Sequence, residues 1–213
     1  MLFRSIDAGG SPTFERLHGR DFWAWLATEP GERAAFDRAM EQGSGRRLDR
    51  LDAVGWRGDE LVVDVGGGNG SLLLSLLARH PAMRGVVFDL AETVRDESVF
   101  GERCTFVAGD FFESVPRGDA YVLSTVLHDW DDERAAAILR TVRSAAKPGT
   151  RLVLLESVVQ AGNDPDGAKW LDLLVLALLG GRERDEPRWR ALLDESGFEP
   201  VAFGAGVIEA RCR

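Results

Sequence analysis

One segment constrains the fold of this chain more than any other: a short apolar run that leads into a glycine-rich turn and then into a helical pattern. The run Leu61–Val65 has the Val-rich composition of a strand buried on both faces. Four of the five residues from Gly66 to Gly70 are glycines, and Ser71–Arg79 has helical periodicity. Without Cβ atoms, such a turn lets a ligand approach backbone amides at a helix N-terminus. The segment predicts an α/β fold with a nucleotide-type ligand beside this strand.

The spacing of the glycines argues against two common nucleotide sites. A dinucleotide fingerprint has glycine at its first, third and sixth positions, but the sixth position counted from Gly66 is Ser71. A P-loop would need Gly-Lys-Ser or Gly-Lys-Thr at a fixed interval, and neither follows. The observed pattern, which begins at Asp64, is Asp-x-Gly-x-Gly-x-Gly, so nicotinamide chemistry and phosphate cradling are both disfavoured.

From Gly58 onward, short apolar runs alternate with longer helical stretches, which is typical of βαβ units on a parallel sheet. Strands covered on both faces are predicted at Leu61–Val65, Val86–Phe88, Thr105–Ala108, Ala120–Leu123 and Leu152–Glu156. Helices are predicted at Ser71–Arg79, Asp132–Ala146 (with Asp131 as its N-cap), Trp170–Leu179 and Pro187–Ser196. Short strands around Glu199–Phe203 and Val207–Ala210 predict a terminal hairpin.

The chain is predicted to consist of a helical arm or connector over residues 1–57 and one α/β domain over residues 58–213. The arm has two helical segments, Thr13–Leu26 and Gly31–Gln42, broken by Pro30 and by Gly43-Ser44-Gly45. Because such an arm cannot bury its apolar side alone, we expect its large apolar residues to pack on the sheet domain or on a partner subunit. These residues are Phe14, Leu17, Phe22, Trp23, Trp25 and Phe36.

The composition and charge of the chain limit the classes of partner that it can bind. The formal net charge of -9 would repel nucleic acid, and the basic residues do not cluster. The longest apolar stretch, Leu173–Leu179, is too short to cross a bilayer, so we expect neither nucleic acid nor membrane as a partner. The two cysteines, Cys104 and Cys212, have neither metal-ligand spacing nor the density of a secreted disulfide framework. The expected location is the cytoplasm.

Further polar and aromatic groups follow the second and third predicted strands. Asp89 ends the second strand, where its two oxygens can accept both hydroxyls of a ribose. Asp110 follows the third strand and can accept an adenine amino proton, while Phe111 can cover the face of the base. With Asp64, these residues stand at consecutive strand ends, the edge at which open α/β sheets bind ligands.

Five segments give the sequence a resemblance to the class I methyltransferases, and more narrowly to the O-methyltransferase family of plant caffeate-type and bacterial natural-product enzymes. They are Asp64-Val65-Gly66-Gly67-Gly68-Asn69-Gly70, Phe88-Asp89-Leu90, Gly109-Asp110-Phe111-Phe112, Leu127-His128-Asp129-Trp130 and Gly180-Gly181-Arg182-Glu183-Arg184. The resemblance implies a Rossmann-like seven-stranded methyltransferase sheet with a reversed C-terminal strand, and S-adenosylmethionine as the cofactor. The resemblance implies cofactor contacts at Gly66, Asp89, Asp110, Phe111 and Ser124. The glycine turn adds Asp64 and Gly68 as candidate cofactor residues, and the end of the second strand adds Leu90.

His128 is the candidate general base, because it follows the strand Ala120–Leu123 at the binding edge and histidine titrates in the range that a base requires. The resemblance implies this role and places Glu156 and Glu183 beside the imidazole. The alternative is a histidine that only bonds a carbonyl. A magnesium site around Asp129 is also conceivable, but helix capping explains most of the acidic residues there, so no metal is expected.

The expected activity is methyl transfer from S-adenosylmethionine to a hydroxyl, phenolic in the first instance, of a small aromatic or polyketide-like metabolite. The predicted acceptor pocket is lined by Trp130, Trp170, Leu173, Leu174, Ala177 and one of Phe22, Trp23 and Trp25, although ordinary core packing would explain any one of them. Two other functions stay open: a relative that binds S-adenosylmethionine while hydroxylating or decarboxylating its substrate, and a truncated, non-catalytic binding module.

The front of the sequence departs from the family. Members usually begin with a winged-helix-like dimerisation domain and form homodimers, whereas here only connecting helices from about Phe14 onward match. We expect either a fragment or an enzyme that works without that domain, and the usual homodimer is in question.

Overall fold

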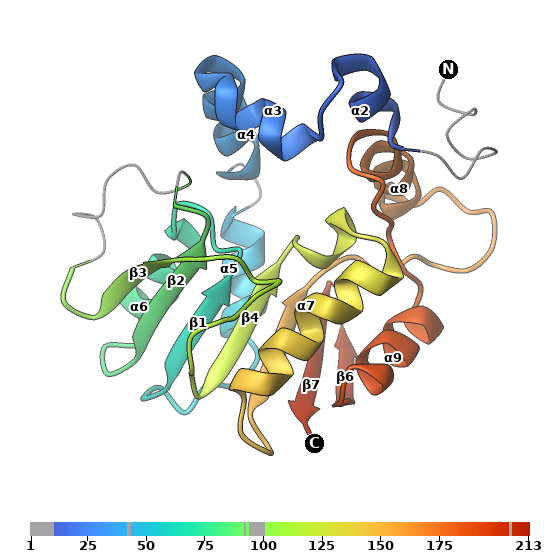
Figure 1. Ribbon diagram of the computed structural model, residues 1–213. Helices are drawn as coiled ribbons and strands as arrows, with labels where there is room; N and C mark the ends of the chain where they lie inside the picture. Colours follow the sequence, from blue (N-terminus) through green and yellow to red (C-terminus); the bar gives the residue numbers. More distant parts are fainter. Residues whose placement is uncertain (1–10, 42–43, 92, 94–100, 205) are drawn as a thin grey trace.

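The computed structural model describes residues 11–41, 44–91, 93, 101–204 and 206–213. Within them, a single seven-stranded sheet has the strand order β3-β2-β1-β4-β5-β7-β6 (Figure 1). The strands are β1 (Leu61–Val65), β2 (Arg84–Asp89), β3 (Cys104–Ala108), β4 (Ala120–Ser124), β5 (Arg151–Leu155), β6 (Phe198–Gly204) and β7 (Val207–Cys212). Neighbouring strands among β1 to β5 pair in parallel, and β7 runs antiparallel to β5 and β6. The predicted Rossmann-like sheet with a reversed terminal strand, and the terminal hairpin, are confirmed.

The position of β1 in the sheet determines where a ligand can bind. β1 pairs with β2 on one side and with β4 on the other, so the strand order reverses direction at this point. In the register, Val65 stands opposite Phe88 and Asp64 opposite Val122, which brings the carboxyl ends of three strands to one edge. Open α/β sheets bind their ligands in the crevice at such a switch point.

Helices cover both faces of the sheet. α5 (Ser44–Asp52) and α6 (Ser71–Arg79) cover one face, and α7 (Asp132–Ala145) and α9 (Glu186–Glu195) cover the other. α6 buries the stripe Leu72, Leu73, Leu76 and Leu77, because these positions share one side of a helix. α7 does the same with alanine and branched aliphatic residues after its predicted N-cap, Asp131, whose Oδ1 accepts from Arg134 N at 2.9 Å.

Two features of the sheet domain differ from the predictions. β3 is an edge strand with mostly exposed or half-buried residues, so the prediction that it is covered on both faces is wrong. β5 ends at Leu155, which leaves Glu156 just beyond the strand. No helix within the described part of the chain is long and apolar enough to cross a membrane.

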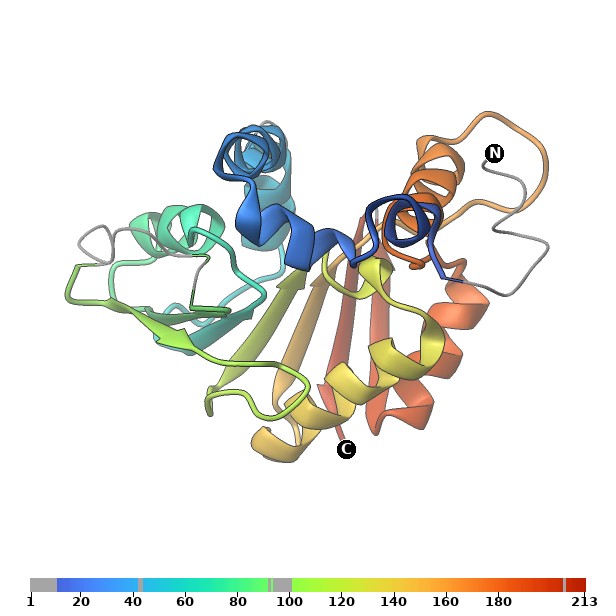
Figure 2. The same ribbon diagram turned by 45° about the horizontal axis from the view of Figure 1, so that its top comes forward.

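The helical arm lies across the carboxyl edge of the sheet (Figures 1 and 2). The helices over this edge are α2 (Thr13–His18), α3 (Phe22–Thr28) and α4 (Pro30–Glu41), and α2 packs on α8 (Gly167–Leu178). α5, also within the predicted arm of residues 1–57, packs instead on α6 and the sheet. The predicted single helix Thr13–Leu26 is wrong: Gly19 adopts a left-handed φ of 71° that ends α2, and Asp21 caps α3 by accepting from Ala24 N at 2.9 Å. The predicted break at Gly43-Ser44-Gly45 is wrong at Ser44, where α5 begins. Gly43 lies outside the described residues.

The aromatic residues of the arm pack largely on one another. The rings of Phe14 and Phe22 lie 5.3 Å apart between centroids, those of Phe22 and Trp23 5.2 Å, and those of Trp23 and Phe36 5.5 Å. The expectation that these residues need the sheet domain or a partner to be covered is therefore only partly right, since the arm builds a small aromatic cluster of its own. Leu17, the one aliphatic residue among those expected to be covered, is 66% exposed.

Candidate active site

The glycine turn joins β1 to α6 and is held against the neighbouring strand, with Gly66 N donating to Phe88 O at 2.8 Å. Gly66, Gly68 and Gly70 have φ angles of 71°, 60° and 76°, in the left-handed region that favours glycine. A Cβ on Gly66 would lie 2.7 Å from Val126 Cγ2, whereas a Cβ on Gly68 would meet no atom of the described residues within 4 Å. The turn is therefore packed at its start and open at Gly68, where a ligand could approach the backbone.

Asp89, at the end of β2, is tied to this turn. Its Oδ2 accepts from Gly68 N at 2.8 Å, and its Oδ1 accepts from Leu90 N at 2.7 Å and from Thr93 Oγ1 at 2.9 Å. Three of the predicted cofactor residues, Gly68, Asp89 and Leu90, are thus in direct contact. The carboxylate fixes the conformation of the turn in addition to any contact that it makes with a ligand.

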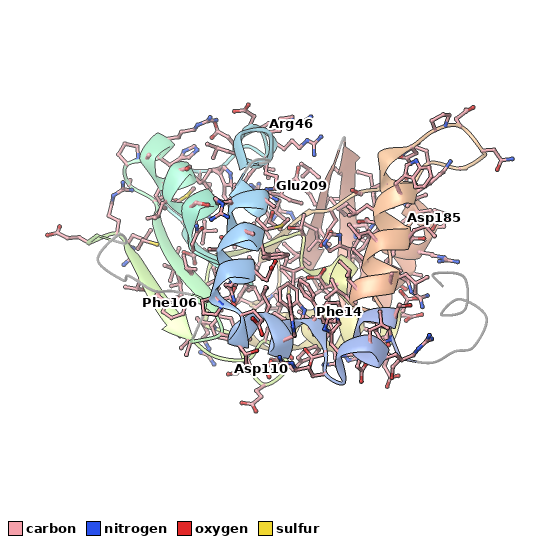
Figure 3. The ribbon with its side chains drawn as sticks, turned by 90° about the horizontal axis from the view of Figure 1, so that it is seen from above. Phe14, Arg46, Phe106, Asp110, Asp185 and Glu209 are labelled. Carbon is pink, nitrogen blue, oxygen red and sulfur yellow. The ribbon has the colours of Figure 1, made fainter. Side chains whose placement is uncertain are left out.

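The other predicted cofactor residues lie at the ends of β3 and β4. Asp110 is exposed, and its Oδ1 accepts from Phe112 N at 2.8 Å. The half-buried ring of Phe111 packs edge-on against Phe112 at 5.0 Å, and the half-buried Ser124 ends β4. Figure 3 looks down on this edge, shows the arm helices lying over it and labels Asp110. That these residues contact a cofactor stays a prediction.

Asp64 is a buried carboxyl group without a hydrogen-bond partner among the described residues. Only 2% of its surface is exposed, and neither Oδ1 nor Oδ2 accepts a hydrogen bond from the part of the chain that the structure describes. The side chain lies beneath the turn, since a Cβ on Gly67 would come within 2.8 Å of Asp64 Oδ2. Burial, followed by the charge of Asp89, raises the pKa of Asp64 to about 7, against the opposing effect of Arg47. An orphaned buried carboxylate beside an open turn fits a ligand that brings a cationic donor, such as an ammonium group.

His128 lies in a short 3-10 helix, Leu127–Asp129, that follows β4 at the same edge. Its residue surface is 8% exposed, and its Nδ1 lies 2.7 Å from Glu183 Oε1. On the other side of the ring, Nε2 lies 3.2 Å from Asp129 Oδ1. Carboxylates lie near both ring nitrogens, and the shorter, hydrogen-bonded contact with Glu183 keeps the proton on Nδ1 in the neutral imidazole. Nε2 is then the nitrogen that can accept a proton.

Glu156 has a different task from Glu183. Its Oε1 accepts from Val126 N at 3.0 Å and from Leu127 N at 2.8 Å, so it anchors the backbone that leads into the 3-10 helix. Its Oε2 lies 3.9 Å from His128 Nδ1 and accepts no hydrogen bond from the described residues. The structure therefore brings all three predicted catalytic residues together, with Glu183 in direct contact and Glu156 acting on the backbone and through charge.

The charges in this cluster act on one another. Burial alone would lower the pKa of His128, but Glu156, the hydrogen bond to Glu183 and Asp129 together raise it to about 9. Burial raises the pKa of Asp129 to about 7, although the imidazole opposes this, and burial likewise raises the pKa of Glu156. Protonation of Asp129 or Glu156 would remove a negative charge that favours the imidazolium. The protonation states of His128 and these two carboxyl groups are therefore coupled.

Sequence reasoning missed two residues of this site. Asp129 was considered only as part of a possible magnesium site, yet its Oδ1 lies 3.2 Å from Nε2 of the candidate base. Arg184 was left without a role, yet it is fully buried and donates to the backbone on both sides of His128. A signal was present for Arg184, because it directly follows Glu183 in the segment that carries the resemblance, but a run of charged residues is typical of a solvated loop.

The predicted substrate residues lie on three elements. Trp130 packs edge-on against Phe112 at 5.0 Å and lies beneath the guanidinium of Arg134 at 4.5 Å. On α8, Trp170 and Leu174 are 74% and 52% exposed, and two further predicted residues are half-buried. Those two are Leu173 and Ala177. The arm residue Trp23 packs within the aromatic cluster described above. Their contact with an acceptor stays a prediction.

A switch-point glycine turn with acidic groups at the following strand ends, and a buried imidazole paired with a carboxylate, define an α/β protein with a cofactor edge and a proton-accepting group beside it. Comparison with known sequences agrees with this class and narrows it, since the sequence model of the O-methyltransferase domain family matches residues 2–199. The chain belongs to this O-methyltransferase family.

Individual relatives are similar over nearly the whole chain. Phenazine O-methyltransferase PhzM of Lysobacter antibioticus is 37% identical over 216 residues, which cover 95% of this chain and 63% of the relative. O-demethylpuromycin-O-methyltransferase of Streptomyces alboniger is 40% identical over 203 residues, covering 89% of this chain and 54% of the relative. The chain thus spans little more than half to about three fifths of the length of these curated relatives.

Solved structures show the same fold. The crystal structure of LaPhzM matches with a TM-score of 0.88 and 32% identity, covering all of this chain and 70% of that one. The structure of NcsB1, from neocarzinostatin biosynthesis, matches with a TM-score of 0.87 and 33% identity, covering all of this chain and 67% of that one. It was solved in complex with S-adenosyl-L-homocysteine and 1,4-dihydroxy-2-naphthoic acid.

Proposed function

We propose that this chain binds S-adenosylmethionine and transfers its methyl group to a hydroxyl, phenolic in the first instance, of a small aromatic or polyketide-like metabolite. The observation that carries this proposal is the buried pair of His128 and Glu183 at the sheet edge that also bears the glycine turn. The names of the relatives support the acceptor class: one is a 3-amino-4-hydroxybenzoate 4-O-methyltransferase, and NcsB1 was solved with a dihydroxynaphthoic acid.

The residues at the edge fit the chemical groups of this cofactor. Asp64 would pair with the ammonium of its methionine part, since that carboxyl group has no other partner among the described residues. The backbone of the turn, packed at Gly66 and open at Gly68, would receive the same part. Asp89 would receive the ribose hydroxyls, because a carboxylate oxygen can accept more than one hydrogen bond. Three further residues would hold the adenine and its surroundings. They are Leu90, Asp110 and Phe111, with Ser124 completing the edge.

Proton removal from the acceptor falls to His128. A phenol loses its proton only weakly at neutral pH, so a base near its oxygen accelerates the transfer. When bound, S-adenosylmethionine supplies a methyl group activated by its sulfonium. As the acceptor oxygen bonds to the methyl carbon and the carbon–sulfur bond breaks, His128 Nε2 receives the proton of the hydroxyl. Glu183 and Asp129, on opposite sides of the ring, stabilise the imidazolium that forms.

Several finer points belong to the same proposal. The arm and α8 flank the edge, and Trp23, Trp130 and Trp170 would contact the acceptor together with Leu173, Leu174 and Ala177. Residues 1–57 would act as a connector to the α/β domain. The buried, unpaired Cys104 and Cys212 fit a cytoplasmic location. The homodimer that the resemblance implies is in question for this chain, and a sizing measurement in solution tests it.

The test is transfer of label from methyl-labelled S-adenosylmethionine to a panel of phenols, with the corresponding methyl ethers as matched controls that lack the hydroxyl. We expect label in the phenol as a new methyl ether, S-adenosylhomocysteine in equal amount, and no label in the controls. Binding of the donor without transfer to any acceptor would favour a non-catalytic binding module. Chemical change of an acceptor without label would favour hydroxylation or decarboxylation.

A further inference from the structure

Arg184 carries a charge in a place where charges are costly. None of its surface is exposed, and its guanidinium lies 5.1 Å from the ring of Trp189. All three guanidinium nitrogens donate hydrogen bonds. Nε donates to Asp132 Oδ1 at 2.8 Å, Nη2 to Trp130 O at 2.8 Å, and Nη1 to Leu127 O at 3.0 Å and Arg182 O at 3.3 Å. A buried guanidinium used in this way joins separate pieces of backbone through their carbonyls.

Two of the carbonyls that Arg184 binds, those of Leu127 and Trp130, lie on either side of the candidate base in the sequence. Leu127 directly precedes His128, and Trp130 follows it by two positions. The 3-10 helix that contains His128 has long internal hydrogen bonds: Asp129 N donates to Val126 O at 3.2 Å, and Trp130 N donates to Leu127 O at 3.3 Å. A short 3-10 turn with such bonds does not fix its own conformation well. The position of the imidazole therefore depends on what holds this segment from outside.

Glu156 anchors the start of this segment through Val126 N and Leu127 N, and three consecutive residues hold the rest. Arg182 N donates to His128 O at 2.8 Å, Glu183 Oε1 contacts His128 Nδ1 at 2.7 Å, and Arg184 bonds the carbonyls on both sides. The approach is so close that a Cβ on Gly181 would overlap His128 O, which only glycine permits. Glu183 can reach the ring only while the 182–184 segment and the 3-10 helix keep this mutual position, and Arg184 makes the side-chain bonds that join them.

We propose that Arg184 is a positioning residue for the base: its guanidinium fixes the backbone on both sides of His128 and so keeps the imidazole on Glu183 and Nε2 directed at the acceptor. This inference rests on the proposed methyl transfer for its consequence in catalysis. The hydrogen bonds of Arg184 to the described residues go to backbone carbonyls and Asp132, and none goes to the imidazole. Lysine could not replace it, since an ammonium cannot donate in a planar fork to two carbonyls and a carboxylate at once.

The test compares Arg184→Lys and Arg184→Met with a matched control, Arg182→Met. Arg182 shares the partner Asp132, at 3.1 Å from its Nη1, but its exposed guanidinium donates to no backbone carbonyl of the 3-10 helix. The first readout does not need activity: histidine-ring NMR on the whole chain, which has three histidines, with His128→Gln to assign the signal. We expect the titration midpoint of His128 to fall by about one pH unit or more in both Arg184 variants, because the ring loses Glu183. It should not change in Arg182→Met.

The second readout is kinetic. Both Arg184 variants should lose roughly 10²-fold in kcat, the effect of a misplaced catalytic group, with the donor KM within about threefold of wild type. A purely structural role would instead reduce the folded fraction without moving the titration midpoint of His128. Folded Arg184 variants with the wild-type midpoint and kcat would overturn the proposal.

A third variant covers the case in which both Arg184 variants fail to fold. Asp132→Ala removes the half-exposed carboxylate that orients Arg184 Nε. The midpoint of His128 should then move in the same direction by a smaller amount, and an unmoved midpoint would overturn the proposal. If the wild-type chain transfers no methyl group, the proposed function fails, while the His128 titration still decides the role of Arg184.

Discussion

Asp64 offers a prediction whose magnitude follows from the structure. Its buried carboxyl group has no hydrogen-bond partner among the described residues, and its pKa is raised from an ordinary value of 3.8 to about 7. At about 1.4 kcal/mol for each pH unit, this difference means that ionised Asp64 destabilises the ligand-free fold by about 4 kcal/mol. The unfolded chain gives up this proton near pH 4 and the folded chain near pH 7, so the stability that the raised pKa provides at low pH is lost as pH rises through that window.

The perturbation is Asp64→Asn, which removes the charge at nearly constant volume. Between pH 5 and pH 8 the wild type should lose about 3 kcal/mol more free energy of unfolding than the variant, measured by urea unfolding without ligand. The buried amide of Asn carries its own cost, but that cost does not change with pH, so the difference in slope is the quantity to compare. Asp110→Asn, which removes an exposed carboxylate from the same edge, is the matched control. Equal losses in wild type and Asp64→Asn would refute the reasoning.

Three further predictions concern the base and the cofactor edge. Glu183→Gln should lower kcat roughly 10- to 100-fold, because the amide still bonds Nδ1 but no longer stabilises the imidazolium; steady-state kinetics with an unchanged rate would contradict the pairing. His128 accepts a proton only when it is neutral, and its pKa is raised to about 9, so kcat/KM should rise with pH up to about 9. The rise of kcat should occur at lower pH, because a bound sulfonium disfavours the imidazolium and so lowers the pKa of His128. Asp89→Ala should weaken S-adenosylhomocysteine binding roughly 10- to 100-fold in calorimetry, as expected for lost charge-assisted hydrogen bonds of about 1.5–3 kcal/mol, and unchanged affinity would count against its assignment.

The parts of the fold that could be predicted from the sequence are those with strong local signals. The step from β1 through the glycine turn to α6 follows from composition alone, and the terminal hairpin from two short apolar runs. The arm was harder, because Gly19 interrupts an otherwise helical pattern and only its left-handed φ of 71° shows that it ends a helix. The reverse error occurred at Ser44, where a sequence typical of a loop begins α5, a helix that is covered by packing on α6.

The site divides in the same way. The positions of Asp89 and His128 after strands are local facts, so the sequence places them at the binding edge. The contact of His128 with Glu183 spans 55 positions, and only the family resemblance suggested it. The burial of Arg184 could not be inferred, because a charged run looks the same in sequence whether it is solvated or buried on backbone carbonyls. The orphaned state of Asp64 is likewise a property of tertiary packing, which composition and periodicity do not report.

The central claim is that His128 removes the proton of an acceptor hydroxyl during methyl transfer. The most direct measurement is single-turnover transfer from labelled S-adenosylmethionine to a phenol that the wild type accepts, compared between wild type and His128→Gln, with S-adenosylhomocysteine affinity measured on both. We expect the rate to fall by roughly 10² to 10⁴ while the affinity changes little, because the imidazole acts on the acceptor and not on the donor. A variant that transfers the methyl group at the wild-type rate would contradict the account.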